Sequence, residues 1–174
     1  MLICVDTLDV LVRFAVTGVI GPLRCDVSLH EVAASLGAPQ DLGPVSKRRR
    51  WPHRFGYGDV ELSACRCRRV QSIHVQAWRE EVDLPRPGAP PACSPSRLTY
   101  AQVMAALQGV GCAVEPVMLQ PPGQLAVRAT STGVEFVFTT ADGAEPMLDK
   151  VGSWIPAHRC SPTPAGAPDD GFGR

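Results

Sequence analysis

The spacing of apolar and polar residues predicts three helices along the chain. Residues 2–16 carry apolar side chains at helical spacing. A second helix is expected to begin at Ser28 and a third at Thr99, because a glutamate or glutamine follows three positions later, Glu31 and Gln102. The side chain of such a residue reaches back to the backbone amide of the capping Ser or Thr and completes a capping box. The pattern therefore predicts where both later helices begin.

Strands are predicted where apolar and polar residues alternate. Within residues 70–78 the alternation has period two, as in a strand with one buried face. The stretch 40–54 is polar and basic, and we expect a loop there. Further strands are expected at 55–62, 113–119, 124–129, 134–140 and 147–154.

The two later helices share a sequence pattern. Both read Ser or Thr, then Glu or Gln at the third position after it, Val at the fourth, Ala at the sixth and Leu at the eighth. We therefore predict an α+β chain in which an N-terminal helix precedes two tandem helix-plus-antiparallel-sheet units. The expected divisions are an N-terminal helix at 1–20, a first unit at 21–83, a proline-rich linker at 84–97, a second unit at 98–155 and a disordered tail at 156–174.

The first copy of this pattern also resembles a known group of proteins. Its residues Ser28-x-x-Glu31-Val32-x-x-x-Leu36-Gly37-x-Pro39 resemble the helix signature of the outer-membrane assembly lipoprotein and β-lactamase-inhibitor-like fold. The inhibitor proteins are similar in a second way, since they join two α+β units in tandem. The resemblance implies a fold that binds other proteins through exposed sheet faces and is not catalytic. The second copy departs from the signature, because it has Gln108-Gly109-Val110 in place of Gly-x-Pro.

Composition and charge narrow the class of protein. The chain has 17 basic and 17 acidic side chains, so its net charge is zero and no overall field attracts nucleic acid or anionic lipid. The N-terminal stretch is too short and too charged to span a membrane, and it has no signal-peptide layout. The seven cysteines are odd in number and irregularly spaced, unlike a secreted disulfide framework. We expect a cytoplasmic protein that does not act at membranes.

The sequence carries no signature of catalysis. It has no G-x-S-x-G, H-E-x-x-H, P-loop or G-x-G-x-x-G pattern, and its four histidines are scattered. Cys65-x-Cys67 with His74 offers zinc-binding side chains, but no second Cys/His pair stands at the spacing of known sites. We therefore predict no catalytic residues, no metal and no cofactor.

Two surfaces remain as candidate binding sites. The first is the outward face of the predicted sheets, where aromatic and arginine side chains with polar neighbours are typical of interface centres. Its candidate residues are Tyr57, Glu61, His74, Gln76, Trp78, Arg128 and Glu135. The second is the basic loop, whose candidate residues are Lys47, Arg48, Arg49, Arg50 and Arg54.

The predicted function is non-catalytic binding of another protein, as an inhibitor or immunity-type partner would do. The first alternative is a regulatory protein that contacts nucleic acid through the basic loop 47–54, although zero net charge argues against it. An enzyme would need a deep pocket converging on His53 or His74. The last alternative is that no activity can be assigned from these residues.

Overall fold

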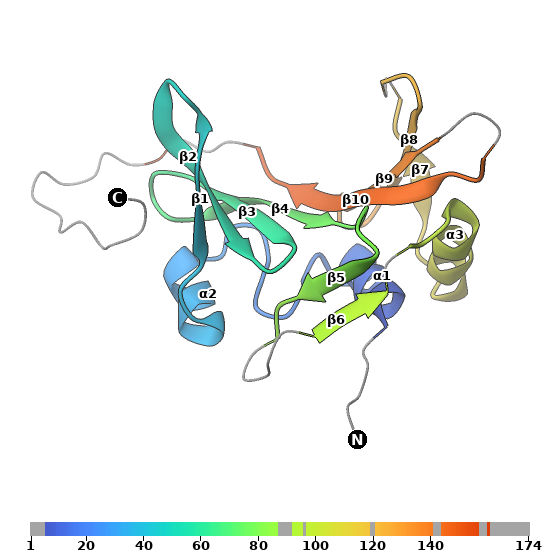
Figure 1. Cartoon of the computed structure of the whole chain (residues 1–174), viewed down its shortest axis with the longest axis horizontal. Helices are drawn as coiled ribbons and strands as arrows, with labels where there is room; N and C mark the ends of the chain where they lie inside the picture. Colours follow the sequence, from blue (N-terminus) through green and yellow to red (C-terminus); the bar gives the residue numbers. More distant parts are fainter. Residues whose placement is uncertain are drawn as a thin grey trace, which may run out of the picture.

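A computed structural model describes residues 6–86, 92–95, 97–118, 121–140, 144–156 and 160 of the chain. Within these residues the chain forms three helices, one large sheet and one small sheet (Figure 1). The helices are α1 (Thr7–Thr17), α2 (Leu29–Leu36) and α3 (Tyr100–Gly109). The strands are β1 (Gln40–Ser46), β2 (Arg49–Tyr57), β3 (Val60–Ala64), β4 (Val70–Gln76), β5 (Glu81–Leu84), β6 (Ala92–Pro95), β7 (Val114–Pro116), β8 (Gln124–Ala129), β9 (Glu135–Thr139) and β10 (Met147–Trp154).

The large sheet is a single eight-stranded antiparallel sheet with the order β1-β2-β3-β4-β10-β9-β8-β7. Its centre is the pairing of β4 with β10, in which Val75 lies opposite Val151. This pairing overturns the predicted fold class, because strands from both halves of the chain form one sheet and not the sheets of two tandem units. The pairing gives β4 and β10 backbone partners on both sides, which edge strands would lack.

The hydrophobic core lies on one face of this sheet. Val60, Val75 and Val151 point from adjacent strands toward the helices, which contribute Phe14 and Val32 to the same cluster. Figure 1 shows the helices on one side of the sheet, while its two ends, β1–β2 and β7–β8, rise on the other side. The face away from the core is called the open face below.

The helix starts follow the sequence closely. Thr99 and Gln102 form the predicted capping box, since Thr99 Oγ1 accepts from the Gln102 amide and Gln102 Oε1 accepts from the Thr99 amide. At Ser28 the cap differs, because its side chain accepts from the amide of His30 and no reciprocal bond is formed with Glu31. Helix α1 begins at Thr7, one residue after its cap, Asp6. The predicted start at residue 2 lies outside the described residues.

Two predicted irregular stretches contain strands. The expected basic loop at 40–54 is wrong, because β1 and β2 form an antiparallel hairpin there. The predicted strand at 55–62 is divided by a turn at Gly58-Asp59. Within the expected linker 84–97, β6 pairs with β5, whose Val82 and Leu84 are buried against the core. Of the expected disordered tail, only Pro156 and Cys160 lie among the described residues.

None of the helices described is long and apolar enough to cross a membrane.

Candidate functional site

A row of residues, all polar except for one glycine, crosses the open face from strand to strand. Cross-strand partners point to the same face of a sheet, so this row is fixed by the register of the strands. From β3 to β7 the partners in order are Glu61, His74, Gly152, Glu135, Arg128 and Glu115. The row therefore runs over six adjacent strands and joins residues from both halves of the chain.

Opposite charges are paired along the row. Arg128 Nη2 lies 3.1 Å from Glu135 Oε2, and Arg128 Nη1 lies 3.9 Å from Glu115 Oε1. At the other end, Arg54 Nη1 lies 3.9 Å from Glu61 Oε1. These pairs keep acidic and basic side chains side by side on the open face.

Trp154 adds a large apolar side chain to the open face. It lies opposite Ser72 at the end of β10 and is 48% exposed. The Arg128 guanidinium lies 5.9 Å from the centre of its ring, within the range of a cation–π contact. An exposed tryptophan beside an arginine is typical of the centre of a protein interface. Trp154 was not among the predicted residues, although the alternation along 147–154 places it on the same face as Lys150.

The ring of His74 lies over Gly152 at the middle of the row. A β-carbon at Gly152 would overlap the His74 Nδ1 atom, so the absence of a side chain there makes room for the ring. Burial lowers the pKa of His74, and the Lys150 ammonium lowers it further, while Glu61 and Glu135 oppose this shift. His74 is therefore held neutral at neutral pH.

The remaining predicted residues of this surface differ in how exposed their side chains are. Gln76 is half-buried next to Lys150 in the neighbouring row, and Trp78 is 60% exposed just after β4. The Arg79 guanidinium lies 5.2 Å from the Trp78 ring centre. Tyr57 is 7% exposed and donates a hydrogen bond of 2.9 Å to the Gly37 carbonyl, so its predicted place on the exposed face is wrong.

The predicted basic residues lie on the β1–β2 hairpin. Lys47 and Arg48 form its turn, and Arg49 and Arg50 follow at the start of β2, all exposed. Arg54 is separate from them, because it lies further along β2, half-buried and paired with Glu61. The hairpin thus groups four of the five predicted basic side chains at one tip.

His53 is buried in this hairpin and does not line a cavity described in the structure. Its Nε2 atom lies 2.6 Å from Asp41 Oδ1, and its ring lies between those of Trp51 and Phe55, tilted against both. The hydrogen bond with His53, followed by a bond from the Gly43 amide, lowers the pKa of Asp41. The contacts of His53 are those of a residue that holds β1 to β2.

Three thiols come together at the turn between β3 and β4. Cys65 and Cys67 lie in the connection between β3 and β4, and their Sγ atoms are 3.0 Å apart. The Cys160 Sγ atom lies 3.6 Å from that of Cys67. The sequence offered Cys65 and Cys67 with His74 as zinc-binding side chains, whereas the structure groups the two thiols with Cys160, which no spacing in the sequence indicated.

The thiols of this cluster affect one another. Desolvation within the cluster, followed by hydrogen bonds with Cys65 and Cys160, raises the pKa of Cys67 to about 12. Burial also acts to raise the pKa of Cys160, but hydrogen bonds from the Cys67 amide and from the neighbouring thiols outweigh it and lower that pKa. These opposite shifts make the Cys160 thiol a stronger acid than the Cys67 thiol.

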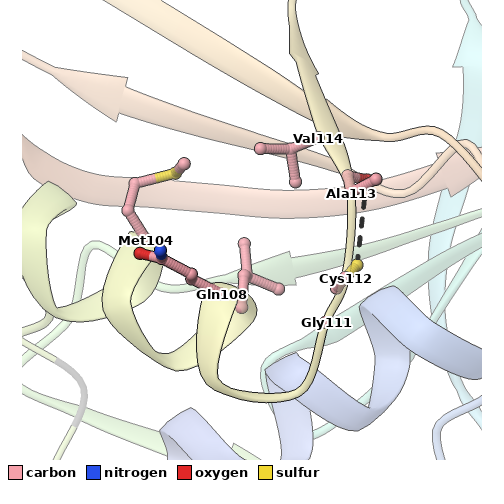
Figure 2. A pocket seen from close by; sticks show the side chains of 7 residues that line it. Met104, Gln108, Gly111, Cys112, Ala113 and Val114 are labelled. Carbon is pink, nitrogen blue, oxygen red and sulfur yellow. Dashed lines mark hydrogen bonds between the residues drawn. The ribbon is translucent and has the colours of Figure 1, made fainter.

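Two open pockets lie away from these residues. One of about 300 Å³ lies between the end of α3 and β7, and Met104, Gln108 and Val114 are among the residues that line it (Figure 2). The Cys112 thiol, 4.0 Å from the Ala113 carbonyl oxygen, lines the same pocket. A second, of about 260 Å³, is lined by residues of α2 and of the segment before it. Neither includes His53 or His74.

Comparison with protein families, with curated proteins and with solved structures found no match. The resemblance to the β-lactamase-inhibitor-like group thus stays a prediction.

Proposed function

We propose that the chain binds another protein through the open face of its large sheet and catalyses no reaction. The observation that supports this most directly is the continuous polar row with Trp154 beside it, on the face that the helices leave uncovered. An inhibitor or an immunity protein acts in this way, by occupying a surface of its target.

The charges on the open face indicate what such a partner would present. Arg54 and Arg128 already have carboxylate partners within the chain, so the face has no large excess of either sign. Trp154 and the exposed Lys150, which lie on the same face of β10 with Gly152 between them, are the groups that a partner would cover. We expect a partner surface with apolar side chains opposite Trp154 and neutral or acidic groups opposite Lys150.

Site-directed cross-linking tests this proposal. A photoreactive residue is placed at position 150 on the open face and, as the matched control, at position 35 on the exposed side of α2. We expect a specific cross-linked protein from position 150 and none from position 35. Once that protein is purified, Trp154→Ala should weaken its affinity by at least roughly 2 kcal/mol, as truncation of an interface centre does. Cross-linking that is equal from both positions, or an affinity unchanged by Trp154→Ala, would contradict the proposal.

A second candidate function is contact with nucleic acid through the tip of the β1–β2 hairpin. The exposed cluster from Lys47 to Arg50 favours it. Filter binding with RNA and DNA at two salt concentrations tests it, because each lost phosphate contact reduces the salt dependence of binding by about one unit of slope. Replacement of Arg48, Arg49 and Arg50 by Ala should then reduce both affinity and slope, and unchanged binding would exclude this tip as a nucleic-acid site.

A further inference from the structure

The three thiols of Cys65, Cys67 and Cys160 are brought together by two separate parts of the fold. The Sγ atoms all lie within 4.8 Å of one another, although 93 positions separate Cys67 from Cys160 in the sequence. Cys65 is 3% exposed, Cys160 is half-buried and Cys67 is exposed. The cluster is therefore closed on one side and open to solvent on the other.

The turn between β3 and β4 fixes the first two thiols. The Arg68 amide donates to the Cys65 carbonyl, and the Cys65 amide donates to the Arg69 carbonyl. Arg68 has a φ of 60°, which is the left-handed conformation that closes a tight hairpin turn. Cys65 and Cys67 thus lie two positions apart on a turn held at both ends by backbone hydrogen bonds.

The pairing of β10 with β4 delivers the third thiol. Trp154, at the end of β10, lies opposite Ser72, and the Ile155 amide donates to the Gln71 carbonyl. The chain that leaves β10 therefore runs beside the start of β4, toward the turn that carries Cys67. Cys160 reaches this turn because the sheet joins the two halves of the chain.

We propose that Cys65, Cys67 and Cys160 bind a divalent metal ion that prefers thiolate ligands, zinc(II) in the first instance. Thiolates around tetrahedral zinc lie at about 2.3 Å from the ion, which separates the sulfur atoms by about 3.8 Å. The separation of 3.6 Å between Cys67 and Cys160 is close to this value. The 3.0 Å between Cys65 and Cys67 has to widen by about 0.8 Å, and Cys67 lies on the exposed side of the cluster, where its side chain has room to turn outward.

The chemistry of the cluster favours a metal ion over three thiols alone. A thiol is a weak hydrogen-bond donor and a weak acceptor, so three of them stabilise one another little. A divalent ion takes the place of their protons, which are released on binding. Three thiolates and one zinc ion carry one negative charge, and the turn supplies arginines at positions 66, 68 and 69 close by in the sequence. The fourth coordination position is left for water or an added ligand.

A disulfide is the main competing chemistry. Oxidation of two neighbouring thiols would join them, release two electrons and two protons to an oxidant, and leave the third thiol unpaired. Such a pair needs no third cysteine, whereas the metal site uses all three. A disulfide forms only when the chain is oxidised, whereas a metal ion binds the reduced thiols, so metal titration of the reduced chain separates the two explanations.

The test uses the full chain, purified and reduced without oxygen, and titrated with cobalt(II) and zinc(II). We expect one metal ion per chain, a sulfur-to-cobalt charge-transfer band that zinc removes, and a higher thermal midpoint with zinc than without it. Replacement of a residue that only supports a metal ligand weakens metal affinity roughly 10- to 100-fold. Cys160→Ser and Cys67→Ser remove ligands themselves, so each should weaken zinc affinity by more than that. Cys112→Ser, which removes a half-buried thiol elsewhere, is the matched control and should bind zinc as the natural chain does.

The same measurements can overturn the proposal. Absence of a stoichiometric zinc ion in the reduced chain would do so, as would equal zinc affinity in Cys160→Ser and Cys112→Ser. Circular dichroism without metal shows whether each variant is folded, and if Cys160→Ser fails to fold, Cys67→Ser on the exposed side of the turn gives the same comparison. None of these measurements requires a protein partner, so their outcome is independent of the function proposed for the open face.

Discussion

Replacement of Gly152 by alanine should destabilise the chain through its contact with His74. A β-carbon at Gly152 would overlap His74 Nδ1 and would lie 3.0 Å from Cε1 of the same ring. It would also lie 3.1 Å from the Ile73 carbonyl oxygen, a tight contact that is less severe than the overlap with His74 Nδ1. The ring must therefore leave its place between Glu61 and Glu135, or β4 and β10 must separate slightly.

The size of this effect follows from two opposing terms. Forcing an extra carbon into a packed contact costs about 1–3 kcal/mol. Alanine in place of glycine in a strand restores roughly 0.5–1 kcal/mol, because the unfolded chain loses conformational freedom. The difference of the two terms is about 0–2.5 kcal/mol, and because the overlap with the His74 ring is severe, we expect Gly152→Ala to lower the free energy of unfolding by about 1–2 kcal/mol.

A double-mutant cycle with His74→Ala measures how much of this loss comes from the ring. In the His74→Ala background the overlap is gone, so Gly152→Ala should be close to neutral, and the coupling energy should be about 1–2 kcal/mol. Urea denaturation of the four proteins gives these values, provided that the slope m is the same in all of them. An equal loss in both backgrounds would refute the reasoning, because it would show that the strand backbone and not the His74 ring resists the added carbon.

Three further predictions concern the turn after β2, the buried tyrosine and the hairpin histidine. Gly58→Ala should lower the free energy of unfolding by roughly 2–4 kcal/mol, because Gly58 has a φ of 59° and its β-carbon would lie 2.6 Å from a backbone oxygen of β5. Gly133→Ala, with a φ of 74° and no atom within 4 Å of the added carbon, is the control and should lose only roughly 1–2 kcal/mol. Burial raises the pKa of Tyr57 from 10.0 to about 12, so its contribution to stability is complete below pH 10 and is lost between pH 10 and 12. Tyr57→Phe should flatten that alkaline decline in urea denaturation. The pKa of Asp41 is lowered from 3.8 by the hydrogen bond with His53, so its stabilisation is present above pH 3.8 and is lost below it. Asp41→Asn should therefore remove part of the stability loss seen on acidification below that pH, and an unchanged acid transition would contradict this.

The sequence predicted most strands but could not predict how they pair. The strands at 124–129 and 147–154 begin and end where β8 and β10 do, because alternation marks one buried face. The same alternation fits a strand at the edge of a small sheet and a strand at the centre of a large one. Nothing in β4 or β10 alone shows that Val75 will lie opposite Val151.

Prolines and charges hid the β1–β2 hairpin. Pro44 lies in β1, which is an edge strand, and edge strands tolerate proline and charged side chains because one side of the strand has no partner. Read as composition, these residues favour a loop. Arg49 and Arg50 lie in β2 before His53, the first residue that pairs with β3, so this part of β2 also has a strand partner on one side only. Pairing on a single side explains how the same residues form strands.

The position of Tyr57 depended on a turn that the alternation does not reveal. The prediction ran the period-two pattern through Gly58 and Asp59, which assigned Tyr57 and Val60 to opposite faces. In the structure the two residues flank a turn and are cross-strand partners, so they point to the same buried face. A glycine followed by an aspartate between apolar residues is a hairpin signal, and its use would have placed Tyr57 in the core.

Strand β10 connects the two sites that we propose. Its outward residues Lys150 and Trp154 lie on the open face, its inward Val151 lies in the core, and the chain beyond its end carries Cys160. Changes at Val151 should therefore weaken the fold and both sites together. Changes at Cys160 lie beyond the last paired residue, so they should affect metal binding and leave the open face intact. Folding depends on the inward side chains of β10, partner binding on its outward side chains, and metal binding on Cys160 beyond its end. Variants at these three kinds of position can therefore separate folding, partner binding and metal binding.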